Sequence, residues 1–350
     1  MKRCRSLRAC VLQFALGWLA ITLSSFSTAE TLLVANKSAA SVSLFELPSG
    51  ALRATLPTGE GPHEVAVSPD GSRALVTNYG TRAGPGDSLT LIDIANAAVI
   101  ATIPLPPGAR PHGVTWIADT QALVTAEGLQ QVLVVDTQEH RVLQQVAVDQ
   151  DVVHMLTVDA DSGKAFTANI GSGTSSVVSI DRGEKIADLE SGAGTEGLAL
   201  INGELWLSNR ADDSVAVFDA ASLELLERFT LKGFPIRVEA DPARERIYIT
   251  LPATDQLAVV DAPTRSVWRL LDFDIPIDSS RLTLLSDRLP DSSIPIGVLL
   301  SGDGQRLFVA HSASHVISIW SAEDLTFVGT IATGIEPDGM DWSPIEIQPK

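Results

Sequence analysis

A short apolar segment that returns seven times is the feature of this sequence that most limits how the chain can fold. The copies occupy residues 41–46, 88–93, 131–136, 176–181, 214–219, 256–261 and 315–320. They are rich in β-branched residues and are too short for helices, so each predicts a β-strand. Repetition at this spacing indicates that one supersecondary unit is used again and again along the chain.

A second short apolar segment precedes each of these strands. It occupies residues 32–36, 74–78, 122–126, 165–169, 205–209, 247–251 and 307–311. A third recurring strand carries His63, His112, His154, Glu196, Ile236, Ile296 and Asp338, at intervals of 49, 42, 42, 40, 60 and 42 residues. Four strands in about 40 to 45 residues are typical of a propeller blade. The sequence therefore predicts an all-β fold, a seven-bladed β-propeller.

The two ends of the repeat predict how the ring closes. Residues 31–57 supply three strands without an innermost partner, whereas residues 338–342 form an innermost strand without a blade of its own. We therefore expect the C-terminal strand to complete the first blade. Such closure pairs the ends of the chain and removes an exposed sheet edge.

The first 29 residues read as a signal peptide. A basic start is followed by an apolar core over residues 11–23 and by the small residues Ser27, Thr28 and Ala29, which is the pattern of a cleaved secretory signal. We expect residues 30–350 to form a single propeller domain, located in the periplasm or secreted. After cleavage no integral membrane segment is expected.

Cysteine and charge exclude several classes of function. Cys4 and Cys10 both lie in the predicted signal peptide, so thiolate chemistry and disulfides are not expected in the mature protein. Loss of four basic residues shifts the formal charge from −18 to −22. A protein with this negative charge is expected to repel nucleic acid. We expect a monomer with a small molecule or a periplasmic protein as its partner.

The strand that ends in Asn78 resembles the repeat of the YVTN β-propeller family. Residues 75–79 read Leu-Val-Thr-Asn-Tyr, and residues 61–71 and 88–93 look like the same family's blade. The resemblance covers nearly all of residues 31–343. It implies a propeller outside the cytoplasm, in a wider group that includes binding propellers, accessory proteins of quinoprotein systems, lyases and lactonases. A shared fold hosts many activities, so the resemblance implies little about chemistry.

Seven residues occupy one equivalent position of the repeat, and a closed ring carries such a position towards its axis. We refer to His63, His112, His154, Glu196, Ile236, Ile296 and Asp338 as the column residues. Five of them form a polar arc, and Ile236 and Ile296 form an apolar wall. Imidazoles with carboxylates suit divalent transition metals such as zinc, copper, nickel or manganese. His63, His112, His154, Glu196 and Asp338 are therefore candidate metal ligands.

The loops that leave the second strands share this face of the disc. They contribute the candidate ligand-binding residues Asn78, Tyr79, Asn169, Asn209, Arg210 and His311, and Arg237 lies one step from the column. An insertion over residues 272–293 explains the 60-residue interval. Long loops in compact domains are often functional, so we expect the insertion on the channel-mouth face.

Three chemistries are compatible with the polar arc. A bound metal ion is one, and acid–base catalysis by His112, His154 and Glu196 is another. The third is binding of a ligand or partner by hydrogen bonds, without catalysis. A plainer alternative is that the histidines only satisfy backbone groups at the starts of strands. We expect a binding protein or accessory factor, with a metal-assisted lyase or a lactonase or other hydrolase as the alternative.

Overall fold

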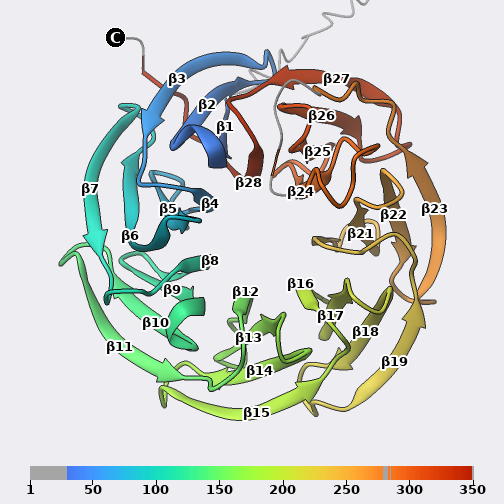
Figure 1. Cartoon of the computed structure of the whole chain (residues 1–350), viewed down its shortest axis with the longest axis horizontal. Helices are drawn as coiled ribbons and strands as arrows, with labels where there is room; N and C mark the ends of the chain where they lie inside the picture. Colours follow the sequence, from blue (N-terminus) through green and yellow to red (C-terminus); the bar gives the residue numbers. More distant parts are fainter. Residues whose placement is uncertain (1–29, 279–282, 284, 349–350) are drawn as a thin grey trace, which may run out of the picture.

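The computed structural model describes residues 30–278, 283 and 285–348. The described residues form seven four-stranded antiparallel sheets arranged as blades around one axis (Figure 1). The expected all-β seven-bladed propeller is confirmed. The predicted signal peptide lies outside the described residues. Among the described residues, no helix is long and apolar enough to cross a membrane.

Each blade runs from an inner strand at the axis to an outer strand at the rim. Blade 1 contains β28 (Pro337–Ser343), β1 (Glu30–Asn36), β2 (Ser41–Leu47) and β3 (Ala51–Pro57); blade 2 contains β4 (Pro62–Val67), β5 (Arg73–Thr81), β6 (Gly84–Asp93) and β7 (Ala98–Pro104). Blade 3 contains β8 (Pro111–Ala118), β9 (Gln121–Ala126), β10 (Gln131–Asp136) and β11 (Arg141–Ala147); blade 4 contains β12 (Val153–Asp159), β13 (Lys164–Asn169), β14 (Thr174–Ser179) and β15 (Glu184–Glu190).

The remaining three blades follow the same order along the chain. Blade 5 contains β16 (Thr195–Ile201), β17 (Glu204–Asn209), β18 (Ser214–Asp219) and β19 (Leu225–Thr230). Blade 6 contains β20 (Val238–Asp241), β21 (Arg246–Leu251), β22 (Gln256–Asp261) and β23 (Ser266–Asp272); blade 7 contains β24 (Pro295–Leu300), β25 (Arg306–His311), β26 (Val316–Ser321) and β27 (Phe327–Ala332). Two short 3₁₀ helices, η1 (Lys37–Ala39) and η2 (Glu127–Leu129), follow β1 and β9.

The ring closes between the two ends of the chain, as the sequence predicts. β28 pairs antiparallel with β1, with Leu32 opposite Trp342 and Leu33 opposite Asp341. The C-terminal strand therefore supplies the inner strand of blade 1, which would otherwise present an open edge.

Apolar side chains fill the space between adjacent blades. One such layer joins blades 5 and 6 and includes the fully buried Trp206, with Val217 and Ile249. Another joins blades 1 and 2 through Leu44 and Val76. Burial of a Leu, Val or Ile side chain contributes about 1.5–3 kcal/mol, so these layers hold the blades together and leave the axis free for polar residues.

A recurring backbone conformation directs each column residue towards the axis. Two residues before every column position, the backbone takes a left-handed conformation, with φ between 51° and 75°. These residues are Gly61, Arg110, Val152, Gly194, Phe234, Ile294 and Glu336. In blades 1 to 5 and 7, the pairing of the inner strand with the second strand also shifts register beside the column residue. Such bulges re-aim side chains, and here they point them into the channel mouth.

Candidate functional site

A cavity of about 220 Å³ lies at the channel mouth, and all seven column residues line it. We refer to it as the mouth cavity. Its other lining residues are Lys37, Tyr79, Glu127, Val152, Ile170, Arg210, Arg237 and Leu285. The structure thus brings together the five candidate metal ligands with Tyr79, Arg210 and Arg237, from blades that are distant in the sequence.

The three histidines form a stack across blades 2, 3 and 4. The ring centroids of His63 and His112 lie 4.3 Å apart, and those of His112 and His154 lie 3.5 Å apart. Tyr79 meets the edges of this stack, with its ring centroid 4.6 Å from that of His63. Three imidazoles therefore share one small volume, with His112 at the centre.

His112 is fully buried, and neither of its ring nitrogens has a hydrogen-bond partner among the described residues. Burial lowers its pKa well below the usual range, and the neighbouring His154 and His63 lower it further. A neutral imidazole always retains one nitrogen lone pair. Because buried polar atoms normally have partners, this lone pair is the strongest sign that a ligand completes the site.

Carboxylates contact the two outer histidines through Nδ1. Nδ1 of His63 lies 2.9 Å from Oδ2 of Asp338, and Nδ1 of His154 lies 2.5 Å from Oε1 of Glu127. The hydroxyl of Tyr79 donates a hydrogen bond of 2.6 Å to the other oxygen of Glu127. Metal-binding histidines commonly hold a carboxylate on one nitrogen, which fixes the ring and leaves the other nitrogen for the ion.

His154 lies between two carboxylates, because its Nε2 is 3.5 Å from Oε1 of Glu196. Burial alone would lower the pKa of His154, but Glu127 and Glu196 together raise it. Burial opposes ionisation of Glu196, yet the hydrogen bond with His154 and the charge of Arg210 lower its pKa to about 2. Arg210 also forms an ion pair with Glu196. The two carboxylates thus favour the protonated form of His154, and Glu196 itself is ionised.

The pKa of His63 shifts in the opposite direction to that of His154. Burial and the nearby ammonium of Lys37 lower the pKa of His63 to about 4, despite its contact with Asp338. His63 is therefore neutral at pH 7, the form in which imidazole binds a metal ion. Burial opposes ionisation of Asp338, but His63 and the ammonium of Lys37, 3.4 Å away, lower the pKa of this carboxyl group well below its usual range.

Two carboxylates near the ring nitrogens had not been singled out as ligands from the sequence. Among the described residues, two sets have potential ligand atoms that all lie within 4.8 Å of one another; they are His63, Glu64, His112 and His112, Glu127, His154. Glu127 follows the second strand of blade 3 on the expected face, but nothing in the sequence distinguishes it from other loop residues. Glu64 follows a column residue directly, and only the bulge in blade 2 brings it near the histidines.

Four candidate ligand-binding residues do not line the mouth cavity and make other contacts. Asn78 donates to Ser88 and Thr90 within its own blade. Asn169 and Asn209 make the equivalent contacts with hydroxyl groups of blades 4 and 5. His311 lies between the hydroxyls of Ser293 and Ser318, 2.7 Å from each. These side chains satisfy polar groups at the ends of second strands.

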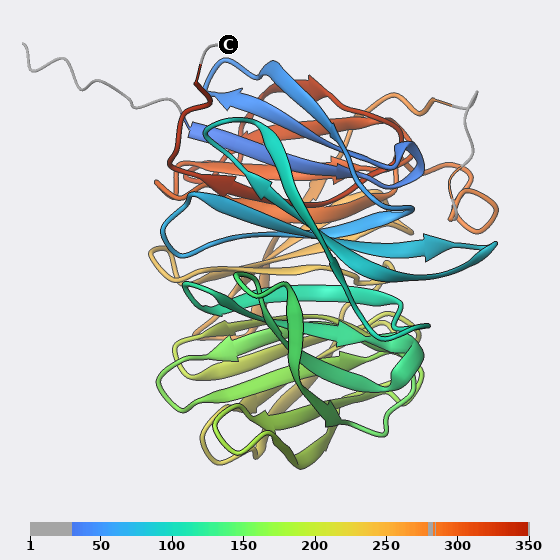
Figure 2. The same ribbon diagram turned by 90° about the vertical axis from the view of Figure 1, so that its left-hand side faces the viewer.

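The insertion contributes to the mouth, as its placement between blades 6 and 7 suggested. Leu285 lines the mouth cavity, packing with Ile236 and Ile296 in an apolar cluster. In the edge-on view of Figure 2 the orange segment after β23 leaves the disc on one face. The apolar wall expected from the two isoleucines is therefore extended by this segment.

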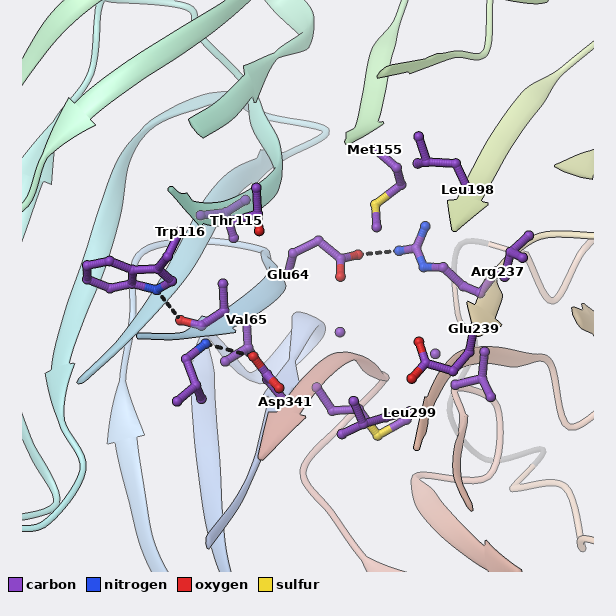
Figure 3. A pocket seen from close by; sticks show the side chains of 18 of the residues that line it. Glu64, Val65, Thr115, Trp116, Met155, Leu198, Arg237, Glu239, Leu299 and Asp341 are labelled. Atoms are coloured by element: carbon purple, nitrogen blue, oxygen red, sulfur yellow. Dashed lines mark hydrogen bonds and ion pairs between the residues drawn. The ribbon is translucent and has the colours of Figure 1, made fainter. Parts of the chain in front are cut away.

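A second chamber of about 380 Å³ lies deeper in the channel (Figure 3). Three carboxylates point towards it, and burial raises their pKa values to about 7 for Glu64, about 8 for Glu239 and about 6 for Asp341. Arg237 lines both this chamber and the mouth cavity and pairs with Glu64. The Glu64–Arg237 pair thus stands at the boundary between the two spaces.

No protein-family model matches this sequence, and no curated protein matches it. Solved structures share its fold. A functionally unknown protein from Desulfotomaculum acetoxidans is 14% identical with a TM-score of 0.73, over 90% of this chain and 99% of that chain. The periplasmic gluconolactonase of Pseudomonas aeruginosa is 14% identical with a TM-score of 0.70, over 90% and 99%. Hydrazine synthase of Kuenenia stuttgartiensis is 16% identical with a TM-score of 0.69, over 89% and 100%. These similarities show the propeller fold alone.

Proposed function

We propose that this protein binds a divalent transition metal ion at the mouth cavity, with His112 as the central ligand and His63 and His154 on either side. The observation that carries this proposal is the buried His112, whose ring nitrogens have no partner among the described residues. Cysteine is absent from residues 30–350, so no thiolate competes as a ligand, and imidazole nitrogen suits zinc, copper, nickel and iron.

The surrounding groups support the same proposal. Glu127 forms a hydrogen bond with Nδ1 of His154, and Asp338 lies 2.9 Å from Nδ1 of His63, so the opposite ring nitrogens face away from these carboxylates. Glu64 and Glu127 complete the two sets of closely spaced ligand atoms.

Metal analysis tests the proposal directly. Protein purified without added chelator is dialysed against zinc or cobalt, and the bound metal is counted in wild type, His112→Ala and His140→Ala. His140 is exposed on the β10–β11 turn and serves as the matched control. We expect about one ion per chain in wild type and in His140→Ala, and none in His112→Ala. Equal metal content in all three proteins would overturn the proposal.

The second candidate is a metal-assisted hydrolase or lyase, favoured by the placement of His154 between Glu127 and Glu196. Glu196 is ionised and can accept a proton, and His154 can return one. Lactone opening needs such a pair together with polarisation of the carbonyl by a cation. One solved structure with the same fold is named as a gluconolactonase.

Turnover of D-glucono-1,5-lactone by the metal-loaded protein tests this second candidate. Glu196→Gln keeps the shape of the side chain and removes the proton acceptor, so we expect it to lower kcat by about 100-fold, the lower range for general bases. Retention of wild-type kcat would assign the metal a binding role only.

We also propose that the protein works in the periplasm as a monomer. The pattern of residues 1–29 supports secretion, and ring closure by β28 leaves blade 1 paired within the same chain. Fractionation of cells followed by light scattering of the purified protein tests both statements. Protein confined to the cytosol, or a stable dimer, would contradict them.

A further inference from the structure

We propose that a pocket beside the mouth cavity binds the carboxylate or phosphate group of a small organic acid. This inference rests on the proposed function, because it assigns the class of molecule that the mouth serves. The pocket has a volume of about 640 Å³, and its lining includes Arg210, Arg228 and Arg288. We refer to it as the arginine pocket.

The arginine pocket adjoins the mouth cavity directly. Both are lined by Ile170 and Arg210. Arg210 pairs with Glu196 on the inner side, and its guanidinium lies 5.4 Å from the centroid of the Phe234 ring. A molecule held in the arginine pocket can therefore extend past Arg210 towards the histidine stack. The combined space lies in the range of small-molecule sites, about 300–1,000 Å³.

The two outer arginines are available to a ligand. Arg228 and Arg288 are exposed, and neither has a carboxylate within ion-pair distance among the described residues. The guanidinium of Arg228 donates a hydrogen bond of 2.7 Å to the backbone carbonyl of Glu190. Guanidinium groups recognise carboxylate and phosphate through paired hydrogen bonds, so an anion is the ligand that this lining favours.

Glycine residues, which have no side chain, form the floor of the arginine pocket and leave room for the ligand. Gly173 and Gly194 line it with φ of 71° and 75°. A Cβ at Gly173 would lie 2.6 Å from the carbonyl oxygen of Gly192. A residue with a side chain therefore cannot replace Gly173 unless the backbone of Gly192 moves.

The distribution of charge over the molecule supports an anionic ligand. Among the described residues, the mouth cavity, the arginine pocket and a third pocket that shares Lys37 and Tyr79 are lined by seven basic and six acidic residues. The chain from residue 30 onwards has 21 basic and 43 acidic residues, so acidic residues outnumber basic ones about twofold overall. Basic side chains are thus concentrated at the mouth, where they attract anions to an otherwise acidic body.

Calorimetric titration with inorganic phosphate and with succinate, at constant ionic strength, tests the inference on metal-free protein. We expect Arg228→Gln and Arg288→Gln each to weaken binding of at least one of these anions by about tenfold. Arg182→Gln is the matched control, because Arg182 is exposed on the β14–β15 turn and pairs with Glu184. It should bind as wild type does.

The two probes and a metal-site variant separate the outcomes. Stronger binding of succinate assigns a carboxylate ligand, and stronger binding of phosphate assigns a phosphate ester. His112→Ala, which should take up no metal in the separate metal analysis, should still bind the anion, so failure of the metal proposal remains distinguishable. No binding of either anion, or equal weakening in Arg182→Gln, would overturn the inference.

Discussion

The imidazole rings of His112 and His154 lie with their centroids 3.5 Å apart, although the two residues belong to different blades and carry opposite pKa shifts. Burial without a partner lowers the pKa of His112. The carboxylates of Glu127 and Glu196 raise that of His154. The two imidazoles in contact therefore differ in how readily each one binds a proton.

Replacement of His112 by leucine should stabilise the metal-free protein. A buried polar atom without a partner costs about 1–3 kcal/mol, and leucine fills a similar volume without that cost. We expect the free energy of unfolding of His112→Leu to rise by about 1 kcal/mol in chelator, measured by urea denaturation. Zinc at 100 times its Kd should raise the free energy of unfolding of wild type by about 2.7 kcal/mol. It should leave that of His112→Leu unchanged. A marked loss of stability in chelator would show that His112 is a satisfied core residue.

Replacement of Asn78 by alanine should weaken the fold and leave metal binding unchanged. The side chain accepts a hydrogen bond from the backbone of Gly59 and donates to Ser88 and Thr90. Loss of these buried contacts should cost about 2 kcal/mol in urea denaturation. Loss of bound metal in a variant that is still folded would instead return Asn78 to the ligand-binding residues.

Glu239 should make the protein less stable as the pH rises. Burial, together with the nearby charge of Asp341, raises its pKa to about 8 from 4.5. Between these values the unfolded chain has lost the proton and the native state retains it, so stability falls with increasing pH. Because the side chain is only partly buried beside a chamber, we expect a loss on the order of 2 kcal/mol between pH 5 and pH 8.

Glu239→Gln provides the measurement for this effect. Glutamine can still accept the 3.0 Å hydrogen bond from the backbone of Leu300, so the variant should match wild type at pH 5 and exceed it at pH 8. Thermal unfolding at both values checks this. Parallel pH profiles for the two proteins would contradict the expected difference.

His311 should make the protein less stable as the pH falls. Burial lowers its pKa to about 3 from 6.5, so between these values the unfolded state binds a proton that the native state does not. Stability is therefore present above about pH 6.5 and falls as the pH decreases, by about 2 kcal/mol from pH 7 to pH 5. In His311→Gln the loss over this interval should be smaller by that amount. An unchanged pH slope in urea denaturation would show that His311 is not held neutral by the fold.

Repetition made the fold predictable, and local backbone geometry limited what could be predicted about the site. Seven equivalent strand positions were sufficient to predict seven blades, closure through β28 and the convergence of His63, His112 and His154 at one mouth. The same logic placed Asn78 and His311 on the correct face, but it could not show that their side chains pair with neighbouring hydroxyls. Glu64 was missed because a β-bulge, which alters the alternation of side chains, has no clear signature in residues 61–65.

Anomalous diffraction at the zinc edge, from crystals grown with zinc, tests metal binding by His112 most directly. We expect a single strong peak in the mouth cavity, about 2.0–2.1 Å from a ring nitrogen of His112, with His63 or His154 as a further ligand. A peak elsewhere on the chain, or an ordered His112 with no metal nearby at saturating zinc, would contradict it.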